Sequence, residues 1–528
     1  MRILVSDKLS EEGLKILRDI KEFTVEVKTE LRPEELREAV AVCDALIVRS
    51  ATKVTQEIIK SARKLRVIGR AGVGLDNVDL NAATERGIVV MNAPAGNTIS
   101  TCEHTMSMLL AAARNIPQAN NSVKSGEWKR SKFMGVELYK KTLGIIGLGR
   151  IGTEVAKRAL SFGMKVIAFD PYLSKDIGEG LGVAMVELEE LLKNSDFITV
   201  HTPLVENTQH MFSDKEFALM KEGARIINCS RGGIIDEEAL ARAIKQGKIA
   251  GACLDVFEHE PPNPDSEILR FENVIASPHL GASTEEAQVN VAVEIAECVR
   301  DYLLGRGIRN AVNYPSIEPE VYKTLAPYIN LAQSLGNFSS QLCEGRLRSV
   351  SIRYSGGITQ HDVAPITMAL IKGILAPILE DSVNFVNALS LAEARKIKVK
   401  ETKLSQEEEF VNLISVRIDT DKETREIQAT LSPNRQPRIV KIDDFYVELS
   451  PCGYMIVIKN WDKPGIIGNL GTLLGQHNVN IASMTFGRRE PGGEAISVLN
   501  VDSNIPQELL GKIRNIENIL AVKLIKLL

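Results

Sequence analysis

Residues 142–152 read TLGIIGLGRIG, an apolar run followed by glycines at positions 147, 149 and 152. This pattern is typical of a β-strand, a tight turn and the start of a helix in a dinucleotide-binding unit. Gly147 permits the turn, Gly149 lets the backbone approach a pyrophosphate, and Gly152 lets the helix pack closely on the sheet. The free N–H groups at the start of the helix would then face the phosphates, so the stretch predicts a bound dinucleotide.

An acidic residue at the end of the next strand sharpens this prediction. Asp170 closes the run KVIAFD, 18 residues after Gly152. A carboxylate at this place hydrogen-bonds the adenosine ribose hydroxyls and would repel a 2′-phosphate, which favours NAD over NADP. The alternative is an aspartate that only caps the turn before Pro171.

The chain alternates short apolar runs with helical segments on both sides of this motif. From the N-terminus to about residue 290, their spacing is that of parallel α/β sheets. The run STCE predicts a capping box between Ser100 and Glu103 that opens a helix through about Arg114. A helix-rich segment at 284–305 leads to VNYPSIEP, whose two prolines predict a boundary.

Two further units follow that boundary. Residues 318–450 combine apolar helices with alternating strand patterns and hold no catalytic-looking cluster. From about residue 453 the order β-α-β-β-α-β predicts a small ferredoxin-like module. At about 150 residues a domain, a chain of 528 residues has room for the resulting four units.

The composition argues against several classes of function. Lys and Arg total 64 against 68 Asp and Glu, a net charge of −4, which disfavours a nucleic-acid or anionic-membrane binder. No apolar run approaches the roughly 20 residues that span a bilayer, and the N-terminus lacks a signal-peptide pattern, so we expect a cytoplasmic protein. The seven cysteines and seven histidines are scattered, which predicts neither a disulfide framework nor a metal site.

Distinctive polar residues follow four predicted strands beyond Asp170. Because the carboxyl ends of parallel strands meet at one edge of a sheet, where ligands bind, we expect these residues to converge. The four strand ends carry Thr202 with Pro203, Arg231 in SRGG, Asp255 with Glu260 close behind, and His279.

Three of these residue types suit hydride transfer on a 2-hydroxy acid. A neutral His279 can take the hydroxyl proton, and Glu260 can orient its ring and favour the protonated form. Arg231 can bind the substrate carboxylate and polarise the developing carbonyl oxygen. Taken singly, each has a plainer interpretation: a satisfied core histidine, a solvated loop glutamate and a surface ion pair.

The motifs GLGRIG, HTPL, NCSRGG, LDVFEHEPP and SPHLGAST together resemble the D-isomer-specific 2-hydroxyacid dehydrogenases. Within that family the chain is most similar to the long-form branch that acts on D-3-phosphoglycerate. The resemblance implies an α/β protein with a Rossmann-like NAD-binding domain inserted in a flavodoxin-like substrate domain, then an α+β intervening domain and a ferredoxin-like ACT domain. The implied bounds are 1–97 with 290–317 for the substrate domain, 98–289 for the NAD-binding domain, 318–452 for the intervening domain and 453–528 for the ACT domain.

The resemblance also implies site residues. Arg231, Glu260 and His279 are the implied catalytic set. The implied cofactor contacts are Val73, Gly147, Gly149, Arg150, Ile151, Gly152, Asp170, Thr202, Pro203, Cys229, Ser230, Asp255, Gly281 and Ala282. The implied substrate contacts are Arg49, Arg70, Val73, Gly74 and Asn97.

Cations near the cleft suit a doubly charged substrate. Arg49 and Arg70 fit a phosphorylated acid, although either could instead form a helix-face salt bridge. Arg130 and Lys132, in EWKRSKF, are candidates for added positive charge near the phosphate, supplied by the same chain or by a neighbouring subunit.

The C-terminal module resembles an amino-acid sensor. Asp462 could accept an amino group, and Asn460 and Asn480 could hydrogen-bond the ligand, which the resemblance implies is L-serine. The related branch often carries an aromatic residue at position 460, where this chain has Asn460 with Trp461 beside it. The alternative is a module that only holds subunits together. In the intervening segment, Arg435, Arg438 and Lys441 fit a solvated basic loop better than an anion site.

The resemblance therefore implies NAD-dependent oxidation of D-3-phosphoglycerate to 3-phosphohydroxypyruvate, the first step of phosphorylated L-serine biosynthesis. Feedback inhibition by serine and a homo-oligomer, a dimer or tetramer, are expected with it. Two alternatives stay open at this point. One is a dehydrogenase of another D-2-hydroxy acid, such as glycerate or glyoxylate/hydroxypyruvate. The other is an NAD-sensing interaction protein of the corepressor kind, which the Arg231, Glu260 and His279 set disfavours.

Overall fold

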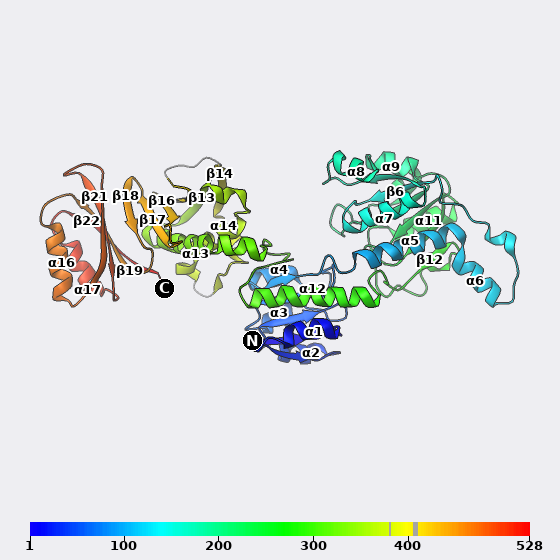
Figure 1. Ribbon diagram of the computed structural model, residues 1–528, viewed down its shortest axis with the longest axis horizontal. Coiled ribbons are helices and arrows are strands. Elements are labelled where there is room, and N and C mark those ends of the chain that lie inside the picture. Colours follow the sequence, from blue (N-terminus) through cyan, green and yellow to red (C-terminus); the bar gives the residue numbers. More distant parts are fainter. Residues whose placement is uncertain (380–381, 405–409, 528) are drawn as a thin grey trace.

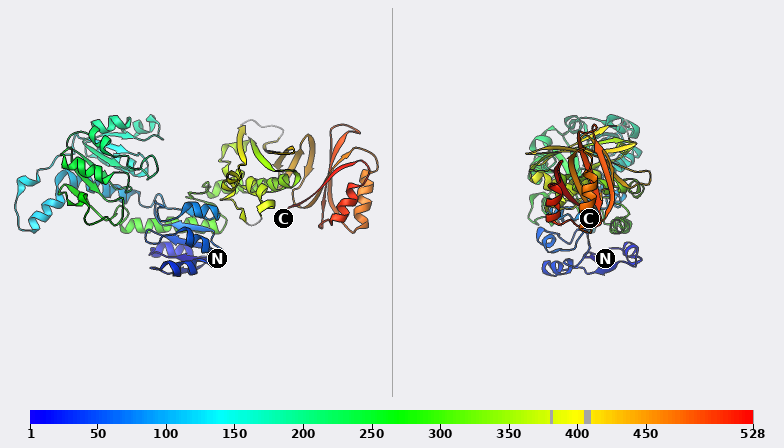
Figure 2. Two further views of the ribbon diagram at one scale, coloured as in Figure 1. Left: turned by 180° about the vertical axis from the view of Figure 1, so that it is seen from behind. Right: turned by 90° about the vertical axis from the view of Figure 1, so that its left-hand side faces the viewer.

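The structure is a computed structural model that describes residues 1–379, 382–404 and 410–527. Its described residues form four β-sheets in an elongated molecule (Figure 1). The seven-stranded sheet lies at one end and the C-terminal four-stranded sheet at the other, with the five- and six-stranded sheets between them. The view from behind shows the same order (Figure 2). The predicted fold class is confirmed.

The N-terminal sheet is parallel, with the order β2-β1-β3-β4-β5. Its central strands are short apolar runs such as ALIV in β3, where all four residues are buried, as expected when helices cover both faces. The strands are β1 (Arg2–Val5), β2 (Thr24–Val27), β3 (Ala45–Val48), β4 (Val67–Arg70) and β5 (Val89–Met91). The helices are α1 (Glu11–Arg18), α2 (Pro33–Val40), α3 (Gln56–Ser61) and α4 (Leu80–Glu85).

The second sheet is also parallel, in the order β12-β11-β10-β9-β6-β7-β8. The strands are β6 (Thr142–Ile146), β7 (Lys165–Phe169), β8 (Ala184–Met185), β9 (Phe197–Val200), β10 (Ala224–Asn228), β11 (Ile249–Leu254) and β12 (Val274–Ala276). The helices are α7 (Arg150–Ser161), α8 (Lys175–Leu181), α9 (Leu188–Asn194), α10 (Asp214–Leu219), α11 (Glu237–Lys245) and the 3₁₀ helix η2 (Glu267–Arg270). The four strands expected to carry functional residues, β9 to β12, are therefore neighbours.

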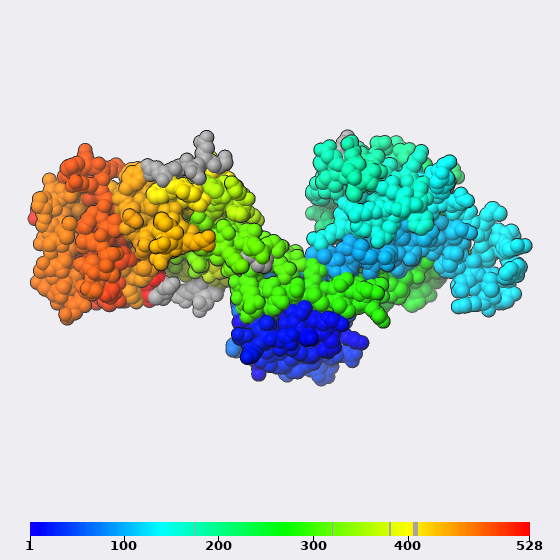
Figure 3. Space-filling view, in the orientation of Figure 1, coloured from blue at the N-terminus to red at the C-terminus, as the bar shows by residue number. Residues whose placement is uncertain are grey.

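Two long helices connect the N-terminal sheet with the seven-stranded sheet. A short arm projects from the end of the molecule that holds the seven-stranded sheet (Figures 1 and 3). The joining helices are α5 (Thr98–Arg114) and α12 (Glu285–Leu303). The arm consists of α6 (Ile116–Lys124) and the 3₁₀ helix η1 (Arg130–Phe133).

The predicted capping box at the start of α5 is wrong. The helix begins at Thr98 with Asn97 as its N-cap residue, so Ser100 and Glu103 lie inside it. The Ser100 hydroxyl donates instead to the carbonyl oxygen of Gly281, at 2.5 Å. The local pattern predicted that Ser100 caps the start of the helix, but its hydroxyl forms a tertiary hydrogen bond to Gly281 instead.

The intervening unit packs long apolar helices against a six-stranded sheet of order β14-β13-β15-β16-β17-β18. The helices are α13 (Pro319–Leu342), η3 (Gly357–Gln360), α14 (Ala364–Leu379) and α15 (Ala388–Ala394). The strands are β13 (Leu347–Gly356), β14 (Lys398–Leu404), β15 (Asn412–Thr420), β16 (Thr424–Leu431), β17 (Pro437–Ile442) and β18 (Phe445–Leu449).

The C-terminal module has the predicted β-α-β-β-α-β order, with an antiparallel sheet β20-β21-β19-β22. One face of this sheet, with Met455 and Val498, joins the apolar core of the intervening unit. Its elements are β19 (Gly453–Trp461), α16 (Ile466–Gln476), β20 (Ile481–Arg488), β21 (Glu494–Val501), α17 (Gln507–Arg514) and β22 (Ile519–Leu527). Among the described helices, none is both long enough and apolar enough to cross a membrane.

Candidate active site

The glycine motif forms the turn between β6 and α7. Gly147 has φ +88°, and a Cβ atom there would lie 2.6 Å from the carbonyl oxygen of His201. A Cβ on Gly152 would collide with the carbonyl of Gly147, whereas one on Gly149 would meet no atom within 4 Å. The backbone at Gly149 is therefore open to a close ligand, as the motif predicts.

Asp170 lies directly after β7 beside this turn. Its carboxylate accepts N–H groups from Leu148 and Tyr172, both at 3.0 Å. The alternative interpretation, a cap of the turn, thus describes part of what this side chain does. Each carboxylate oxygen can accept more than one hydrogen bond, so these contacts leave acceptor capacity for ribose hydroxyls.

A cavity of about 300 Å³ lies next to the turn. It is lined by residues of both parallel-sheet units. Burial raises the pKa of the Cys229 thiol on its wall, which keeps that group protonated. The predicted site residues that line it are Val73, Asn97, Gly149, Arg150, Ile151, Thr202, Pro203, Cys229, Ser230, Arg231, His279, Gly281 and Ala282.

His279 and Glu260 form a pair at the edge of this cavity. Their Nδ1 and Oε2 atoms are 2.8 Å apart. An ionised carboxylate only accepts hydrogen bonds, so Nδ1 carries the proton and Nε2 keeps a lone pair. The hydrogen bond and charge of Glu260 raise the pKa of His279 against the effect of burial. Burial opposes ionisation of Glu260, but the contact with His279 outweighs it and lowers the pKa of that carboxyl.

Arg231 reaches across the cleft from the turn after β10. The side chain of Asn228 closes this turn by donating to the carbonyl of Arg231 at 2.8 Å and accepting from the backbone of Ser230 at 3.0 Å. The guanidinium then pairs with Asp76 of the N-terminal unit, with Nε 3.3 Å from Oδ2. A Cβ on Gly74 would collide with this guanidinium, so any larger residue there would displace the side chain of Arg231.

Two further arginines come from the N-terminal unit, but neither lines this cavity: Arg70 lies near Arg231, and Arg49 lines a separate cavity with Asp7 and Lys8. The buried Nε atoms of Arg49 and Arg70 have no hydrogen-bond partner. Burial, and then the nearby charge of Arg231, lower the pKa of Arg70 to about 10. Asn97 Oδ1 and Thr202 Oγ1 are likewise buried and unpartnered. Buried polar atoms are normally satisfied, so this group of open donors and acceptors indicates a ligand site.

Asp255, predicted as a cofactor contact, is fully buried beneath the loop that carries His279. Its carboxylate accepts the N–H groups of Leu280 and Gly281, both at 2.8 Å. Hydrogen bonds from His104 and Ser277 outweigh burial and lower the pKa of Asp255. The structure therefore places this carboxylate as a support for the loop.

Several residues of the site escaped the sequence analysis. Thr101 and His201 line the cavity, Asp76 pairs with Arg231, and His104 contacts Asp255. His201 belongs to the motif HTPL and Thr101 to STCE, but neither motif by itself predicts a role for these two side chains. Burial lowers the pKa of His201 to about 4, so its ring is neutral in the cavity wall.

The predicted contacts of the C-terminal module do not come together within one chain. Asp462 accepts from Arg488 at 2.8 Å, at the end of β20 that pairs with Ala495. Asn480 donates to Asp502 at 2.6 Å, at the opposite end of the same strand. At about 3.3 Å a residue over the eight residues from Asn480 to Arg488, these two pairs are about 26 Å apart.

Asn460 lies inside the same module. It is 4% exposed, and its Oδ1 accepts from the hydroxyl of Ser497 at 2.9 Å. Its Nδ2 donates to the carbonyl of Trp461, also at 2.9 Å. The side chain of Asn460 therefore already has protein partners for both of its functional groups.

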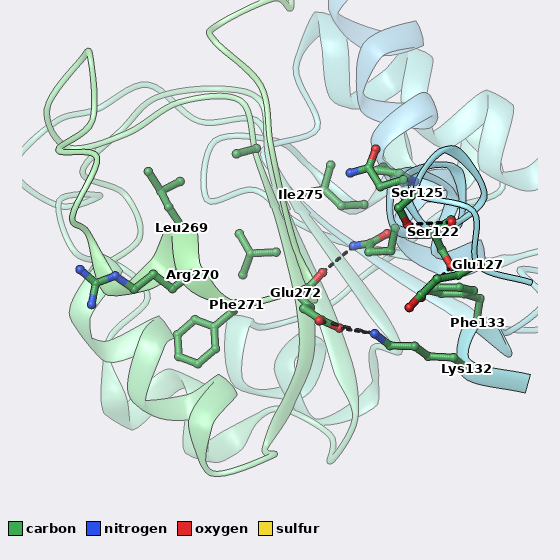
Figure 4. Close-up of a pocket in the computed structure, with 15 residues that line it drawn as sticks. Ser122, Ser125, Glu127, Lys132, Phe133, Leu269, Arg270, Phe271, Glu272 and Ile275 are labelled. Atoms are coloured by element: carbon green, nitrogen blue, oxygen red, sulfur yellow. Dashed lines mark hydrogen bonds and ion pairs between the residues drawn. The ribbon is translucent and has the colours of Figure 1, made fainter. Parts of the chain in front are cut away.

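The remaining predicted cations lie away from the cleft cavity. Lys132, in η1 with Arg130, pairs with Glu272 at 3.1 Å within its own chain (Figure 4). Arg438 donates to Ser450, Lys441 stacks on Tyr446, and Arg435 lies in the turn between β16 and β17. In the part of the chain that is described, no group of three or more His, Cys, Asp or Glu residues is arranged to hold a metal ion.

Three family models match successive parts of the chain. The NAD-binding domain of the D-isomer specific 2-hydroxyacid dehydrogenases matches residues 106–281. The D-3-phosphoglycerate dehydrogenase intervening domain matches 324–443, and the ACT domain matches 454–518.

Relatives named D-3-phosphoglycerate dehydrogenase match over the whole length. The chain is 48% identical to the D-3-phosphoglycerate dehydrogenase of Methanocaldococcus jannaschii over 528 residues, which is 100% of both chains. It is 44% identical to the Bacillus subtilis enzyme of the same name, covering 100% of this chain and 99% of that one. Among solved structures, the D-lactate dehydrogenase of Aquifex aeolicus with NAD and lactic acid matches at TM-score 0.52 and 30% identity, over 58% of this chain and 96% of that one.

Proposed function

The chain belongs to the D-isomer-specific 2-hydroxyacid dehydrogenase family, among its D-3-phosphoglycerate dehydrogenases, and we propose how its cleft residues perform that reaction. The activity is NAD-dependent oxidation of D-3-phosphoglycerate to 3-phosphohydroxypyruvate. The observation that carries the assignment of residues is the His279–Glu260 pair, 2.8 Å apart, at a cavity with unpartnered cationic and polar atoms. We also propose four domains, bounded at 1–97 with 290–317, 98–289, 318–452 and 453–528.

The turn after β6 fits NAD. Gly149 leaves its backbone open, Thr202 presents a buried unpartnered hydroxyl, and Asp170 keeps acceptor capacity for the ribose. We assign the glycine turn, Asp170 and the cavity-lining residues after β9 and β10 to hold the cofactor. NAD, when bound, accepts the hydride that leaves C2 of the substrate.

His279 is the proposed acid–base group. Its Nε2 takes the proton of the C2 hydroxyl as the hydride leaves, so the net products are the 2-oxo acid, NADH and a proton. Glu260 accepts from Nδ1, which fixes the tautomer and stabilises the imidazolium that forms. Arg231 binds the carboxylate of the substrate and polarises the oxygen that becomes the ketone.

The phosphate end is assigned to the N-terminal unit. The guanidinium groups of Arg49 and Arg70 have open Nε donors, and no carboxylate is paired with either among the described residues. Among the described residues, the one carboxylate paired with Arg231 is the exposed Asp76; its Nη1 also donates to the carbonyl of Ser230, at 2.7 Å. This excess of positive charge suits an acid that carries both a carboxylate and a phosphate. The backbone at Val73 and Gly74, with the side chain of Asn97, completes the proposed substrate contacts.

L-serine is the proposed effector of the C-terminal module. The ACT domain is consistent with feedback control by a small molecule. In this state Asp462 is held by Arg488, so binding of an amino group would exchange one cationic partner for another. Asn480 lies at the far end of the module, so it could reach the same ligand only from a second copy of the chain.

A homo-oligomer, a dimer or tetramer, is proposed from the arm. Its segment 116–134 exposes Trp128 by 76% and Met134 by 82%, an unusual concentration of apolar surface for a projecting element. A second cavity, of about 610 Å³, lies between the arm and β12, with Phe133 on its wall (Figure 4). We propose that a second copy of the chain covers this surface. Replacing Trp128 by Glu should then lower the mass measured by light scattering.

The cytoplasm is the proposed location, because both the phosphorylated substrate and NAD are metabolites of that compartment. The test of the proposed function is NADH formation from D-3-phosphoglycerate at alkaline pH, with and without millimolar L-serine. Turnover that serine suppresses supports the substrate, the direction and the effector together. Reduction of hydroxypyruvate or glyoxylate without turnover of D-3-phosphoglycerate would contradict the substrate assignment.

A further inference from the structure

A second histidine lies behind the loop that carries His279. Nε2 of His104, on α5, is 3.1 Å from Oδ1 of Asp255 and 3.3 Å from the hydroxyl of Ser277. Ser277 also donates to the same carboxylate oxygen, at 2.6 Å. Asp255 is fully buried, so this carboxylate depends entirely on protein donors.

The cluster acts on the backbone that follows His279. Asp255 accepts the N–H of Leu280 on one oxygen and that of Gly281 on the other. The carbonyl of Gly281 is held in turn by the hydroxyls of Ser100 and Thr101, from the same helix as His104. Helix α5 therefore fixes Gly281 in two ways. Its Ser100 and Thr101 bind the carbonyl of Gly281, and its His104 binds the carboxylate that accepts the N–H of Gly281.

The backbone conformation of His279 shows why this loop needs several hydrogen bonds to hold it. Its φ is +55°, in the left-handed region that residues other than glycine adopt at a cost. Such a conformation persists only where its surroundings over-determine it. The backbone N–H of His279 also donates to the carbonyl of Asp255, at 2.9 Å. Asp255 thus holds three consecutive residues, 279 to 281, through its carbonyl and its carboxylate.

We propose that His104 is a positioning residue for catalysis, acting through Asp255 to fix the direction of the His279 side chain. The inference rests on the proposed function insofar as His279 is the acid–base group. Without His104, the buried carboxylate loses a charge-assisted donor and turns toward its remaining partners, which moves the amides at 280 and 281. A shift of a fraction of an ångström at His279 is enough to slow proton transfer, while cofactor and substrate contacts elsewhere stay in place.

The test uses three variants of the full chain. His104→Leu removes the donor, and His104→Gln places an amide N–H near the position of Nε2. Leu109→Ala is the matched control, because Leu109 is fully buried on the same helix and belongs to the apolar core around β6 and α7. For each protein, kcat, both KM values and the melting temperature are measured.

The expected result is a split between kcat and KM. His104→Leu lowers kcat about tenfold or more with each KM within about threefold, and His104→Gln recovers most of kcat. Leu109→Ala lowers the melting temperature at least as much but keeps kcat within about threefold. The inference is overturned if His104→Leu loses no more kcat than Leu109→Ala, or if the glutamine variant is as slow as the leucine variant.

The substrate assignment is tested separately by the same proteins. They are also assayed in reduction with hydroxypyruvate and glyoxylate. A wild type that is inactive on D-3-phosphoglycerate contradicts the substrate assignment alone, because the ranking of kcat values on the accepted acid still decides the role of His104.

Discussion

The cleft and the C-terminal module differ in whether the polar side chains of their predicted sites have hydrogen-bond partners. In and beside the cleft, Arg49, Arg70, Asn97 and Thr202 each bury a donor or acceptor that has no partner. In the module, Asp462 and Asn480 each have a charged or polar partner within 2.8 Å. Asn460 is satisfied as well, through Ser497 and Trp461.

This difference separates a prepared site from one that must be rearranged. Buried groups without partners cost free energy unless a ligand completes them, so the cleft has its binding groups in place before the ligand arrives. Surface groups that are already paired offer a ligand only the difference between old and new contacts. Substitutions in the cleft should therefore have large effects and those in the module small ones.

The strongest test of the prepared site is His279→Asn. Loss of the acid–base group should lower kcat by about 10²- to 10⁴-fold, while NADH still binds and quenches or enhances fluorescence as in the wild type. His210→Asn is the matched control, because His210 also has a positive φ, +48°, and pairs with Glu258 at 3.2 Å. Equal losses of kcat in both variants would contradict the role given to His279.

Removing one open cation should cost less. Arg49→Met should lower kcat/KM for D-3-phosphoglycerate by about 10- to 100-fold, the value of about 1.5–3 kcal/mol for hydrogen bonds to a charged group. The loss should be smaller for D-glycerate, which lacks the phosphate. Arg353→Met is the control. The Nε atom of Arg353 is also buried without a partner, but this residue is on β13 of the intervening unit and not in the unit that is assigned the phosphate. Equal losses on both substrates would remove Arg49 from the phosphate site.

The pair between His279 and Glu260 predicts a shift in pH dependence. Oxidation needs a neutral His279, so kcat/KM falls as pH drops through the pKa of that ring, which Glu260 raises. Glu260→Gln removes this cause, so the pKa of His279 falls and the acidic limb moves to lower pH. The maximal rate falls too, because the imidazolium loses its anionic partner. The pH profile of Glu258→Gln, which alters the other histidine–glutamate pair, should keep its acidic limb in place.

Many of the cleft residues could be predicted, because the carboxyl ends of neighbouring parallel strands lie at the same edge of a sheet. β9, β10, β11 and β12 are neighbours in both the sequence pattern and the sheet, so the residues after them had to meet. Asp76 and His104 could not be found this way. Each acts through a partner more than 100 residues away, Arg231 or Asp255, and no local pattern encodes a contact between segments so far apart in the sequence.

The misassigned capping box and the separated module contacts have the same origin. Ser100 fitted the pattern of a helix N-cap, yet it lies inside the helix and its hydroxyl donates to the carbonyl of Gly281. Asp462 and Asn480 flank helix α16 in the sequence, but their partners lie at opposite ends of β20 in its antiparallel pairing with β21. Short-range spacing predicts which element a residue belongs to better than which partner it finds.

The smallest effect is expected where the module's pairing is broken. Asp462→Asn removes the ion pair with Arg488, whose contact lowers the pKa of this carboxyl, but the pair is largely solvated. The melting temperature should therefore change by no more than about 2 °C. If Asp462 meets the amino group of serine, the serine concentration for half-inhibition should rise severalfold. Glu508→Gln, which breaks another surface pair of the same module, with Lys512 on α17, should leave that concentration unchanged. An unchanged value in both variants would mean that the paired carboxylate of Asp462 is structural, and that serine must be bound by other groups.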